Sequence, residues 1–218
     1  MNNPFPSELA AKIQEAGIIA VLIVERVEDA VPLAKSLLEG GVRIMELTLR
    51  TPTALDSLRA ICDQVPDMVA GVGTILTSAQ ADAAKQAGAA FGVSPGFNRR
   101  VVDAAVSAGL PFAPGVATPS DVEAALEAGC QLMKFFPCEP SGGLPYLKAM
   151  AAPYLHLGVK FIPLGGVNAA NMKTYLSEPI VSAVGGSWLA PKDLVSSANW
   201  QGLSRLAAEA VRIISETR

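Results

Sequence analysis

Short hydrophobic runs recur along the chain at nearly regular intervals. They begin near Ile18, Arg43, Met68, Ala90, Pro111, Gln131, Val159 and Ile180. Successive starts are 20 to 28 residues apart, which is enough for a strand, a turn and a crossover helix but for little more. The pattern therefore predicts eight strand–helix units.

The segments between the runs have the spacing of amphipathic helices. In the first segment the hydrophobic residues share one helical face, namely Val27, Ala30, Val31, Ala34, Leu37 and Leu38. Helix starts are predicted at Thr51-Pro52 and Thr118-Pro119, with a capping box over residues 77–80. Helix ends are predicted at four glycines, Gly40, Gly88, Gly109 and Gly129. Residues 7–15 are expected to form one extra helix before the first run, and residues 203–214 the last helix.

Eight such units with nearly continuous hydrophobic strands predict an α/β fold, a (β/α)8 TIM barrel with an extra N-terminal helix. An open doubly wound sheet is the alternative, but its first strand is usually followed by a glycine-rich turn. Here the first run leads into Val24-Glu25-Arg26-Val27, which contains no glycine. No linker or low-complexity segment divides the chain, so residues 1–218 are expected to form one barrel domain.

Composition narrows the possible functions. Of the 218 residues, 50% are hydrophobic and 17% are charged, with a net charge of −3, so a basic surface for nucleic acid is not expected. The longest hydrophobic run, residues 17–24, is too short to span a membrane. Three cysteines beside a large core indicate reduced thiols in the cytoplasm. The single histidine, His156, argues against a metal site built on imidazoles.

One carboxylate and two lysines lie inside the predicted strands: Glu46, Lys134 and Lys160. A lysine desolvated among hydrophobic side chains is biased toward the free amine, which is a nucleophile that forms Schiff bases with carbonyls. Lys134 suits this role, and a structural ion pair is the equal alternative. Lys160 begins its strand, at the end of the barrel away from the usual active site, so a structural role is favoured there.

Glu46 and Arg50 are separated by an even number of positions, so both share one strand face with Thr48. If that face points inward, Glu46 is placed to shuttle protons and Arg50 to bind a substrate carboxylate. The alternative is a structural pair between Glu46 and Arg50.

Two glycine pairs end the seventh and eighth strands. Gly165-Gly166 and Gly185-Gly186 would expose backbone N–H groups where barrels often bind phosphate, although ordinary turns also use glycine. We therefore expect an anion at this side of the mouth.

The remaining candidates are weaker. Cys138 is expected near the site, Cys62 and Cys130 are expected to be buried thiols, His156 a surface residue and Trp188 a packing residue.

A buried lysine, an acid, an arginine and an anion pocket suit imine chemistry on a phosphorylated keto acid. Six motifs carry a more specific likeness: Glu46-Leu47-Thr48-Leu49-Arg50, Gly71-Val72-Gly73-Thr74, Ser94-Pro95-Gly96, Lys134-Phe135-Phe136-Pro137, Gly165-Gly166 and Gly185-Gly186-Ser187-Trp188. In this order and spacing they resemble the 2-keto-3-deoxy-6-phosphogluconate (KDPG) and 4-hydroxy-2-oxoglutarate (KHG) aldolase family, over nearly the whole chain.

The resemblance implies a class I aldolase that needs no cofactor or metal and assembles as a homotrimer. It implies cleavage of KDPG, a substrate of the Entner–Doudoroff pathway, to pyruvate and glyceraldehyde 3-phosphate, and cleavage of KHG to pyruvate and glyoxylate. The matching positions make Lys134 the Schiff-base lysine and Glu46 the proton shuttle. The substrate-binding positions are Arg50 and Thr74 for the carboxylate, Pro95 and Phe136 for the walls, and Gly165, Gly166 and Ser187 for the phosphate.

Three positions test how far the resemblance extends. Leu164 stands where the family commonly has threonine, so one hydroxyl near the phosphate end is missing. Cys138 stands where alanine is common, which predicts sensitivity to thiol reagents. Thr48 and Arg50 differ from the proline and asparagine of a subfamily that acts on the galactonate epimer, which argues against that substrate. A phosphosugar isomerase or epimerase, or a non-catalytic phosphate-binding barrel, is the alternative to an aldolase.

Overall fold

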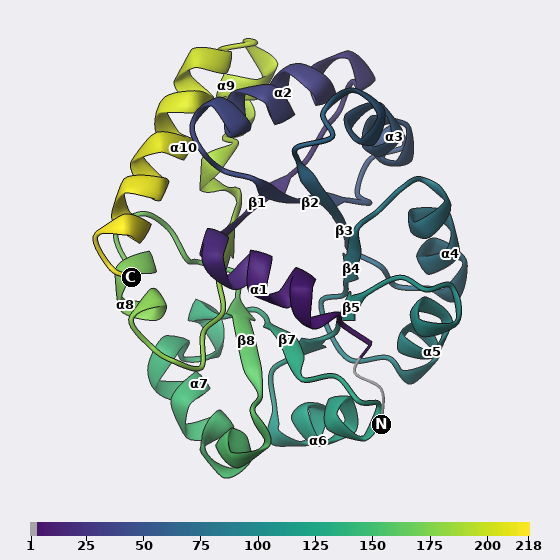
Figure 1. Ribbon diagram of the computed structural model, residues 1–218, viewed down its shortest axis with the longest axis vertical. Helices are drawn as coiled ribbons and strands as arrows, with labels where there is room; N and C mark the ends of the chain where they lie inside the picture. Colours follow the sequence, from purple (N-terminus) through teal and green to yellow (C-terminus); the bar gives the residue numbers. More distant parts are fainter. Residues whose placement is uncertain (1–3) are drawn as a thin grey trace.

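Parallel strands form a closed ring in the computed structural model, which describes residues 4–218, and helices surround the ring (Figure 1). The strands are β1 (Ile18–Leu22), β2 (Ile44–Thr48), β3 (Val69–Gly73), β4 (Phe91–Val93), β5 (Phe112–Ala113), β6 (Gly115–Val116), β7 (Leu132–Phe135), β8 (Lys160–Pro163) and β9 (Val184–Gly186). The α-helices are α1 (Ser7–Ala16), α2 (Val27–Glu39), α3 (Ala54–Gln64), α4 (Ser78–Gln86), α5 (Arg99–Ser107), α6 (Pro119–Glu127), α7 (Gly143–Ala151), α8 (Met172–Leu176), α9 (Lys192–Ser196) and α10 (Trp200–Ser215). Short 3₁₀ segments are η1 (Glu139–Ser141), η2 (Ala152–Leu157) and η3 (Ser187–Leu189).

The ring closes through two joints. Strands pair in the orders β5-β4-β3-β2-β1-β9 and β6-β7-β8. Pro114 separates β5 from β6 because proline has no N–H to donate. Its carbonyl still accepts a hydrogen bond from Lys134 N at 2.9 Å, so β5 and β6 together occupy one strand position of the barrel. Parallel bridges from Phe161 to Val181 and from Leu164 to Gly185 join β8 to β9. The predicted (β/α)8 barrel is confirmed. Its last strand, β9, begins at Val184 rather than near Ile180.

Side chains of alternate strand residues point into and out of the barrel, and two hydrophobic clusters result. The outer cluster, between strands and helices, includes Ile18, Ala20 and Leu22 of β1. The inner cluster is smaller and consists of Phe5, Ile13, Ile19, Val21, Ile44, Phe91, Val93, Ala113, Leu132, Ile162, Leu164 and Ala183. The inward-pointing side chains of neighbouring strands therefore lie in a few layers along the barrel axis.

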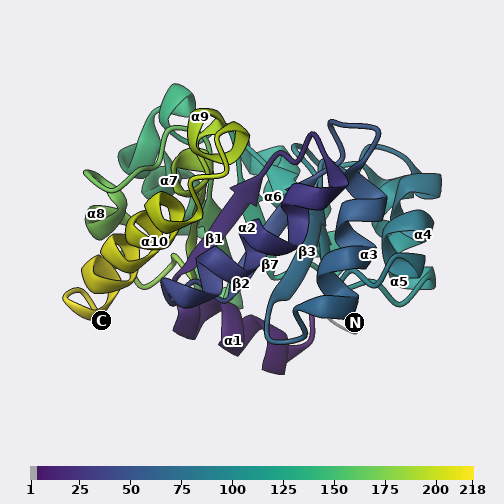
Figure 2. The same ribbon diagram turned by 90° about the horizontal axis from the view of Figure 1, so that it is seen from above.

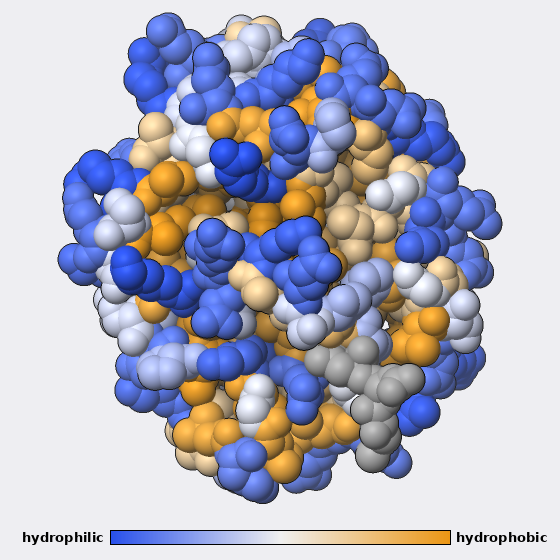
Figure 3. All heavy atoms as spheres, viewed as in Figure 1, coloured by the Kyte–Doolittle hydropathy of each residue, from blue (hydrophilic) through white to orange (hydrophobic). Residues whose placement is uncertain are grey.

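The extra N-terminal helix closes one end of the barrel. In Figure 1 α1 lies across the ring, and in Figure 2 the arrowhead of β1 points away from it. Phe5, just before α1, meets Phe91 with ring centroids 6.2 Å apart, and Ile13 of α1 is fully buried. Hydrophilic side chains cover much of the middle of this face, with hydrophobic atoms between them (Figure 3). The carboxyl ends of the strands are thus at the opposite, unplugged end.

Most local signals in the sequence are confirmed. Thr77 and Thr118 each form a complete capping box, with Gln80 and Asp121 respectively. The glycines that follow α4, α5 and α6, namely Gly88, Gly109 and Gly129, have φ of 95°, 67° and 83°, the left-handed conformation expected of a helix-ending glycine.

Two local predictions need correction. α2 ends at Glu39, directly before Gly40 as predicted, but Gly40 is not the left-handed glycine. Gly40 has a φ of −80°, and Gly41 takes the left-handed conformation with a φ of 90°. Gly40 is needed for another reason: a Cβ there would be 2.4 Å from Ala207 Cβ of α10. Thr51 does not cap α3, which begins at Ala54; its hydroxyl donates to Val24 O at 2.7 Å instead. Both errors come from tertiary contacts that a local pattern does not contain.

Helix lengths match the expected ones closely. α1 ends one residue after the predicted end, and α10 begins at Trp200, where Asn199 Oδ1 caps it by accepting from Gly202 N at 2.9 Å. Within residues 4–218 no helix combines the length and hydrophobicity that a membrane span requires.

Candidate functional site

Glu46 and Lys134 form a buried ion pair inside the carboxyl half of the barrel. Lys134 Nζ donates to Glu46 Oε1 at 2.9 Å and to Oε2 at 3.0 Å. The residues are only 2% and 6% exposed. Glu46 on β2 and Lys134 on β7 are 88 residues apart, and both occupy inward positions, one level above Ile44 and Leu132 of the inner cluster. The structural pair between Glu46 and Arg50, one of the two alternatives for Glu46, is therefore wrong, because the carboxylate pairs with Lys134.

Glycines on β3 make room for this pair. A Cβ on Gly73 would lie 2.0 Å from Glu46 Oε1, so only glycine fits beside the carboxylate. One level below, a Cβ on Gly71 would lie 2.2 Å from the Phe91 ring. The glycines of β3 therefore leave room for the larger side chains of Glu46 and Phe91, from the neighbouring strands, in the centre of the barrel.

An aromatic ring lies close to the lysine. Lys134 Nζ is 5.5 Å from the centroid of the Phe136 ring, a distance at which the ring attracts the ammonium group. Phe136 follows β7 and, like Lys134, points inward by the two-residue alternation. The ammonium group is thus held by one carboxylate and one ring.

A cavity of about 310 Å³ opens from the ion pair at the carboxyl ends of the strands. It is lined by Val21, Glu46, Thr48, Arg50, Thr74, Pro95, Lys134, Phe136, Leu164, Gly165, Gly185, Gly186 and Ser187. Eight of the nine site residues predicted from the sequence are in this set. Gly166 is the exception, because it lies behind Gly165. Val21 was not predicted, although the two-residue alternation along the first strand could have identified it. It follows Ile19 by two residues and is the inward residue near the carboxyl end of β1.

Arg50 is the free cation of the cavity. It is exposed, and it makes no ion pair or hydrogen bond with any residue in the 4–218 range that the structure describes. Thr48, one inward position earlier, donates its hydroxyl to Leu22 O at 2.9 Å. An unpaired guanidinium at the mouth is suited to a carboxylate, which it binds through two parallel hydrogen bonds.

Lys160 has a different environment. Its Nζ donates to Pro179 O at 2.6 Å, at the amino end of β8 and away from the cavity. His156 is exposed on η2, also away from the cavity. The structural reading of Lys160 and the surface position of His156 are confirmed.

The glycine pairs differ in what requires them. Gly165 and Gly166 both have a φ of 93°, a left-handed conformation that favours glycine. Gly186 has an extended backbone, but a Cβ there would lie 1.8 Å from the Trp188 ring. Trp188 is therefore a packing residue, as predicted, and it fixes the loop that carries Ser187 at the cavity.

The cysteines are not reactive groups of the cavity. Cys138 is fully buried, its Sγ donates to Tyr175 Oη at 3.2 Å, and burial raises the pKa of its thiol to about 11. The expectation that Cys138 makes the site sensitive to thiol reagents is therefore wrong, since the side chain points behind the strand. Burial likewise raises the pKa of Cys130 to about 12. Cys62 is half-buried rather than buried, because it lies at the edge of α3.

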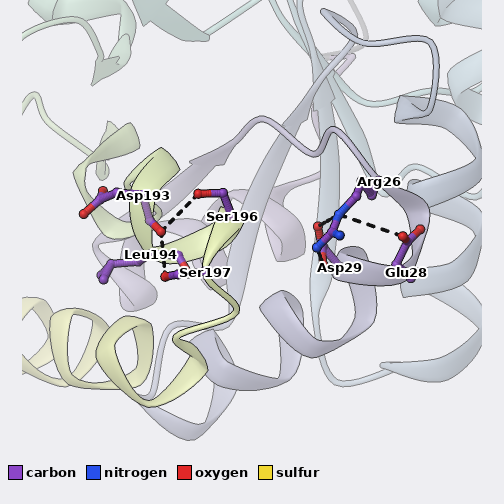
Figure 4. A network of polar contacts seen from close by, with 7 residues as sticks. All are labelled: Arg26, Glu28, Asp29, Asp193, Leu194, Ser196 and Ser197. Atoms are coloured by element: carbon purple, nitrogen blue, oxygen red, sulfur yellow. Dashed lines mark hydrogen bonds and ion pairs between the residues drawn. The ribbon is translucent and has the colours of Figure 1, made fainter.

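A second cavity of about 520 Å³ lies next to the first, and Val21 and Ser187 line both. Its charged side chains are paired with one another. Arg26 donates to both oxygens of Asp29 at 2.8 Å and lies 3.8 Å from Glu28 (Figure 4), and Lys192 lies 2.9 Å from Glu25. On the other side of this cavity the hydroxyls of Ser196 and Ser197 donate to Asp193 O (Figure 4). The paired charges leave this cavity without a preference for an anion.

No set of three or more His, Cys, Asp or Glu side chains within residues 4–218 could hold a metal ion. The chemistry that this arrangement supports is that of the amine itself, placed beside a proton acceptor and below a carboxylate-binding arginine.

Comparisons with known proteins agree with this geometry. Residues 9–206 match the family model of KDPG and KHG aldolase. A 2-dehydro-3-deoxy-phosphogluconate aldolase of Treponema pallidum is 42% identical over 93% of this chain and 95% of its own, and a KHG/KDPG aldolase of Escherichia coli is 40% identical over 89% and 90%. A KDPG aldolase of Legionella pneumophila, solved with pyruvate captured as a covalent carbinolamine intermediate, has a TM-score of 0.88 at 37% identity and covers 92% of this chain and 97% of its own. The chain belongs to the KDPG and KHG aldolase family.

Proposed function

We propose that Lys134 is the amine that forms a Schiff base with the C2 ketone of KDPG and that Glu46 carries the protons of the reaction. The observation that supports this most directly is the buried pair at the base of the cavity. An ammonium group is not a nucleophile, and Glu46, at 2.9 and 3.0 Å, is placed to accept its proton. Transfer of that proton to Glu46 leaves an amine that can attack the ketone.

The steps balance as follows. Lys134 Nζ adds to C2 to give a carbinolamine. Glu46 then gives the proton that it took from the ammonium group to the departing hydroxyl, so water leaves, an iminium ion forms and Glu46 is a carboxylate again. The C3–C4 bond breaks, its electrons move into the iminium to form an enamine, and the C4 hydroxyl proton passes to Glu46. Glyceraldehyde 3-phosphate leaves, Glu46 returns its proton to C3, and water hydrolyses the new iminium ion to release pyruvate and the ammonium group of Lys134. The iminium ion accepts the electrons of the broken C3–C4 bond. One water is released when the iminium ion forms and one is consumed when it is hydrolysed.

The remaining lining residues suit the two ends of this substrate. We assign the keto-acid carboxylate to Arg50 and Thr74, and the walls around the reacting carbons to Pro95 and Phe136. We assign the phosphate end to Gly165 and Ser187, which line the cavity, and to Gly166, which follows Gly165 and is not part of the lining. Leu164, which is 5% exposed, supplies no hydroxyl there, so backbone N–H groups carry more of the phosphate binding.

The same residues suit KHG, since it shares carbons C1 to C4 of the 2-keto-4-hydroxy acid and ends in a C5 carboxylate where KDPG has the C5–C6 arm with its phosphate. We propose this second cleavage, with glyoxylate as the other product. We also propose that the protein is a cytoplasmic homotrimer that serves the Entner–Doudoroff pathway. Three free thiols support the reducing compartment. The homotrimer is the assembly that the resemblance to the family implies. Analytical ultracentrifugation tests the assembly, and a monomer would contradict it.

A coupled assay tests the activity. The protein is incubated with KDPG, lactate dehydrogenase and NADH, with EDTA present, and the release of pyruvate is followed as NADH oxidation. We expect turnover that EDTA does not change. A phosphosugar isomerase or a non-catalytic barrel would release no pyruvate, and that result with folded protein would overturn the proposal.

A further inference from the structure

Four side chains behind the cavity form a continuous hydrogen-bonded chain that the proposed reaction does not use. Cys138 Sγ donates to Tyr175 Oη at 3.2 Å, and Tyr175 Oη donates to Glu139 Oε1. Asn171 Nδ2 donates to the same carboxylate oxygen at 3.4 Å. Cys138 and Glu139 follow β7, whereas Asn171 and Tyr175 belong to α8 and its start. None of the four lines the 310 Å³ cavity.

This chain is attached to the Gly165–Gly166 loop at several points. Glu139 N donates to Gly165 O at 2.9 Å, and Asn171 Nδ2 donates to Gly166 O at 3.2 Å. A Cβ on Gly166 would lie 2.6 Å from Glu139 Cβ, so the glutamate packs directly against this glycine. The loop therefore rests on Glu139 from behind, while Gly165 lines the cavity in front.

The chain has a defined direction because Tyr175 stays protonated. Tyr175 is 2% exposed, and burial is the largest cause that raises the pKa of its phenol. A protonated phenol accepts one hydrogen bond, from Cys138, and donates one, to Glu139. Glu139 is exposed at its outer side, so without Tyr175 and Asn171 its side chain would be free to adopt other rotamers.

We propose that Tyr175 and Asn171, acting through Glu139, are positioning residues that hold the Gly165–Gly166 loop in the conformation that binds the phosphate of the substrate. This inference rests on the proposed function, because it assigns the phosphate to that loop. The chain sets affinity for phosphorylated substrates and has no part in the chemistry at Lys134.

The test compares two substrates in the variant Tyr175→Phe. This variant loses the hydrogen bond from Cys138 and the one to Glu139. The bond to Glu139, which supports the loop, is worth about 1 kcal/mol, so KM for KDPG is expected to rise about five-fold. KM for KHG, which has no phosphate, kcat for both substrates and the yield of borohydride-reduced pyruvate adduct are expected to stay unchanged. Tyr154→Phe is the matched control, since its hydroxyl bonds to Glu123 and Pro119 on the surface and should change nothing.

Two further variants keep the test decisive. Glu139→Gln keeps an oxygen that accepts from Tyr175, so its KM for KDPG should equal the wild-type value. Glu139→Ala should raise KM for KDPG at least as much as Tyr175→Phe does. If Tyr175→Phe does not fold, Asn171→Ala carries the same prediction. An equal rise of KM for both substrates, or none, would overturn the inference. Failure of the wild-type protein to form any pyruvate adduct would instead overturn the proposed function.

Discussion

Two lysines on neighbouring strands show how position within the barrel determines what a residue can do. Lys160 pairs in register with Leu132, only two residues before Lys134 on the adjacent strand. Lys160 lies at the amino end, where its ammonium group reaches Pro179 O at the rim. Lys134 lies one level further along, where burial forces it onto the carboxylate of Glu46.

The two halves of the barrel interior differ in the same way. The amino half is filled by hydrophobic side chains, among them Ile44, Phe91 and Leu132, and α1 closes it. In the carboxyl half β2, β3 and β7 carry Glu46, Gly73 and Lys134, and the cavity opens beside Glu46 and Lys134. One half supplies stability and the other supplies a rigid frame for reactive groups, so substitutions in the two halves should affect different measurements.

The largest expected effect separates the two lysines. Lys134→Ala should lower kcat at least about 10,000-fold, since removal of a covalent nucleophile abolishes the route it provides. Lys160→Ala should leave kcat within about two-fold, because the side chain contacts only a surface carbonyl. Steady-state kinetics of KDPG cleavage measure both.

The Lys134→Ala variant leaves Glu46 buried without a partner, which costs about 3–5 kcal/mol of stability. The double variant Lys134→Met with Glu46→Gln removes both charges and should be folded and equally inactive. Substantial activity in that double variant would contradict the role of Lys134.

The second-largest effect on kcat is expected at Glu46, the proposed proton carrier. Glu46→Gln keeps an oxygen that accepts from Lys134 but removes the group that gains and loses a proton. We expect kcat to fall about 1,000-fold, within the range for loss of a general acid–base. Turnover near the wild-type value, measured in the same assay, would show that another group carries the protons.

The space beside Glu46 should matter almost as much. In Gly73→Ala the new Cβ would lie 2.0 Å from Glu46 Oε1 and must displace the carboxylate. A displacement of about 1 Å can cost about 100-fold in rate. Gly96→Ala, at a glycine with nothing within 4 Å of its Cβ position, is the control and should have no effect on kcat.

A smaller effect is expected at the mouth. Arg50→Ala should raise KM for KDPG and for KHG about 10- to 100-fold, because each charge-assisted hydrogen bond contributes about 1.5–3 kcal/mol. Arg50→Lys should fall between this variant and the wild type, since it retains the charge without the planar fork. A change in KM for only one substrate would argue against binding of their shared carboxylate.

The smallest effect is expected at Cys138. Cys138→Ala should leave kcat within about two-fold, since the thiol contacts Tyr175 and not the cavity. Burial raises the pKa of Cys138 to about 11, so the reactive thiolate is scarce at pH 8 and increases only as pH rises toward that value. Mass spectrometry after iodoacetamide at pH 8 should find Cys62 modified first, and inactivation through Cys138 would contradict this.

Short-range rules predicted the fold and several cavity residues, whereas the resemblance to the family supplied the roles of Thr74, Pro95, Phe136 and Ser187. A two-residue alternation on each strand is enough to place Glu46 and Arg50 on one face and to put Lys134 beside Phe136. The same rules could not choose a partner for Glu46, since its bond to Lys134 spans 88 residues and depends on the way the ring closes. Gly40 was misread for a related reason: contact with α10, and not the end of α2, requires that glycine.

Reduction with borohydride tests the central claim most directly. The protein is incubated with pyruvate and borohydride, the intact mass is measured, and the modified peptide is mapped. The account predicts a single reduced pyruvyl adduct on Lys134, in the wild type and in Lys160→Ala. An adduct on Lys160, or no adduct on folded protein, would contradict the assignment of Lys134 as the Schiff-base lysine.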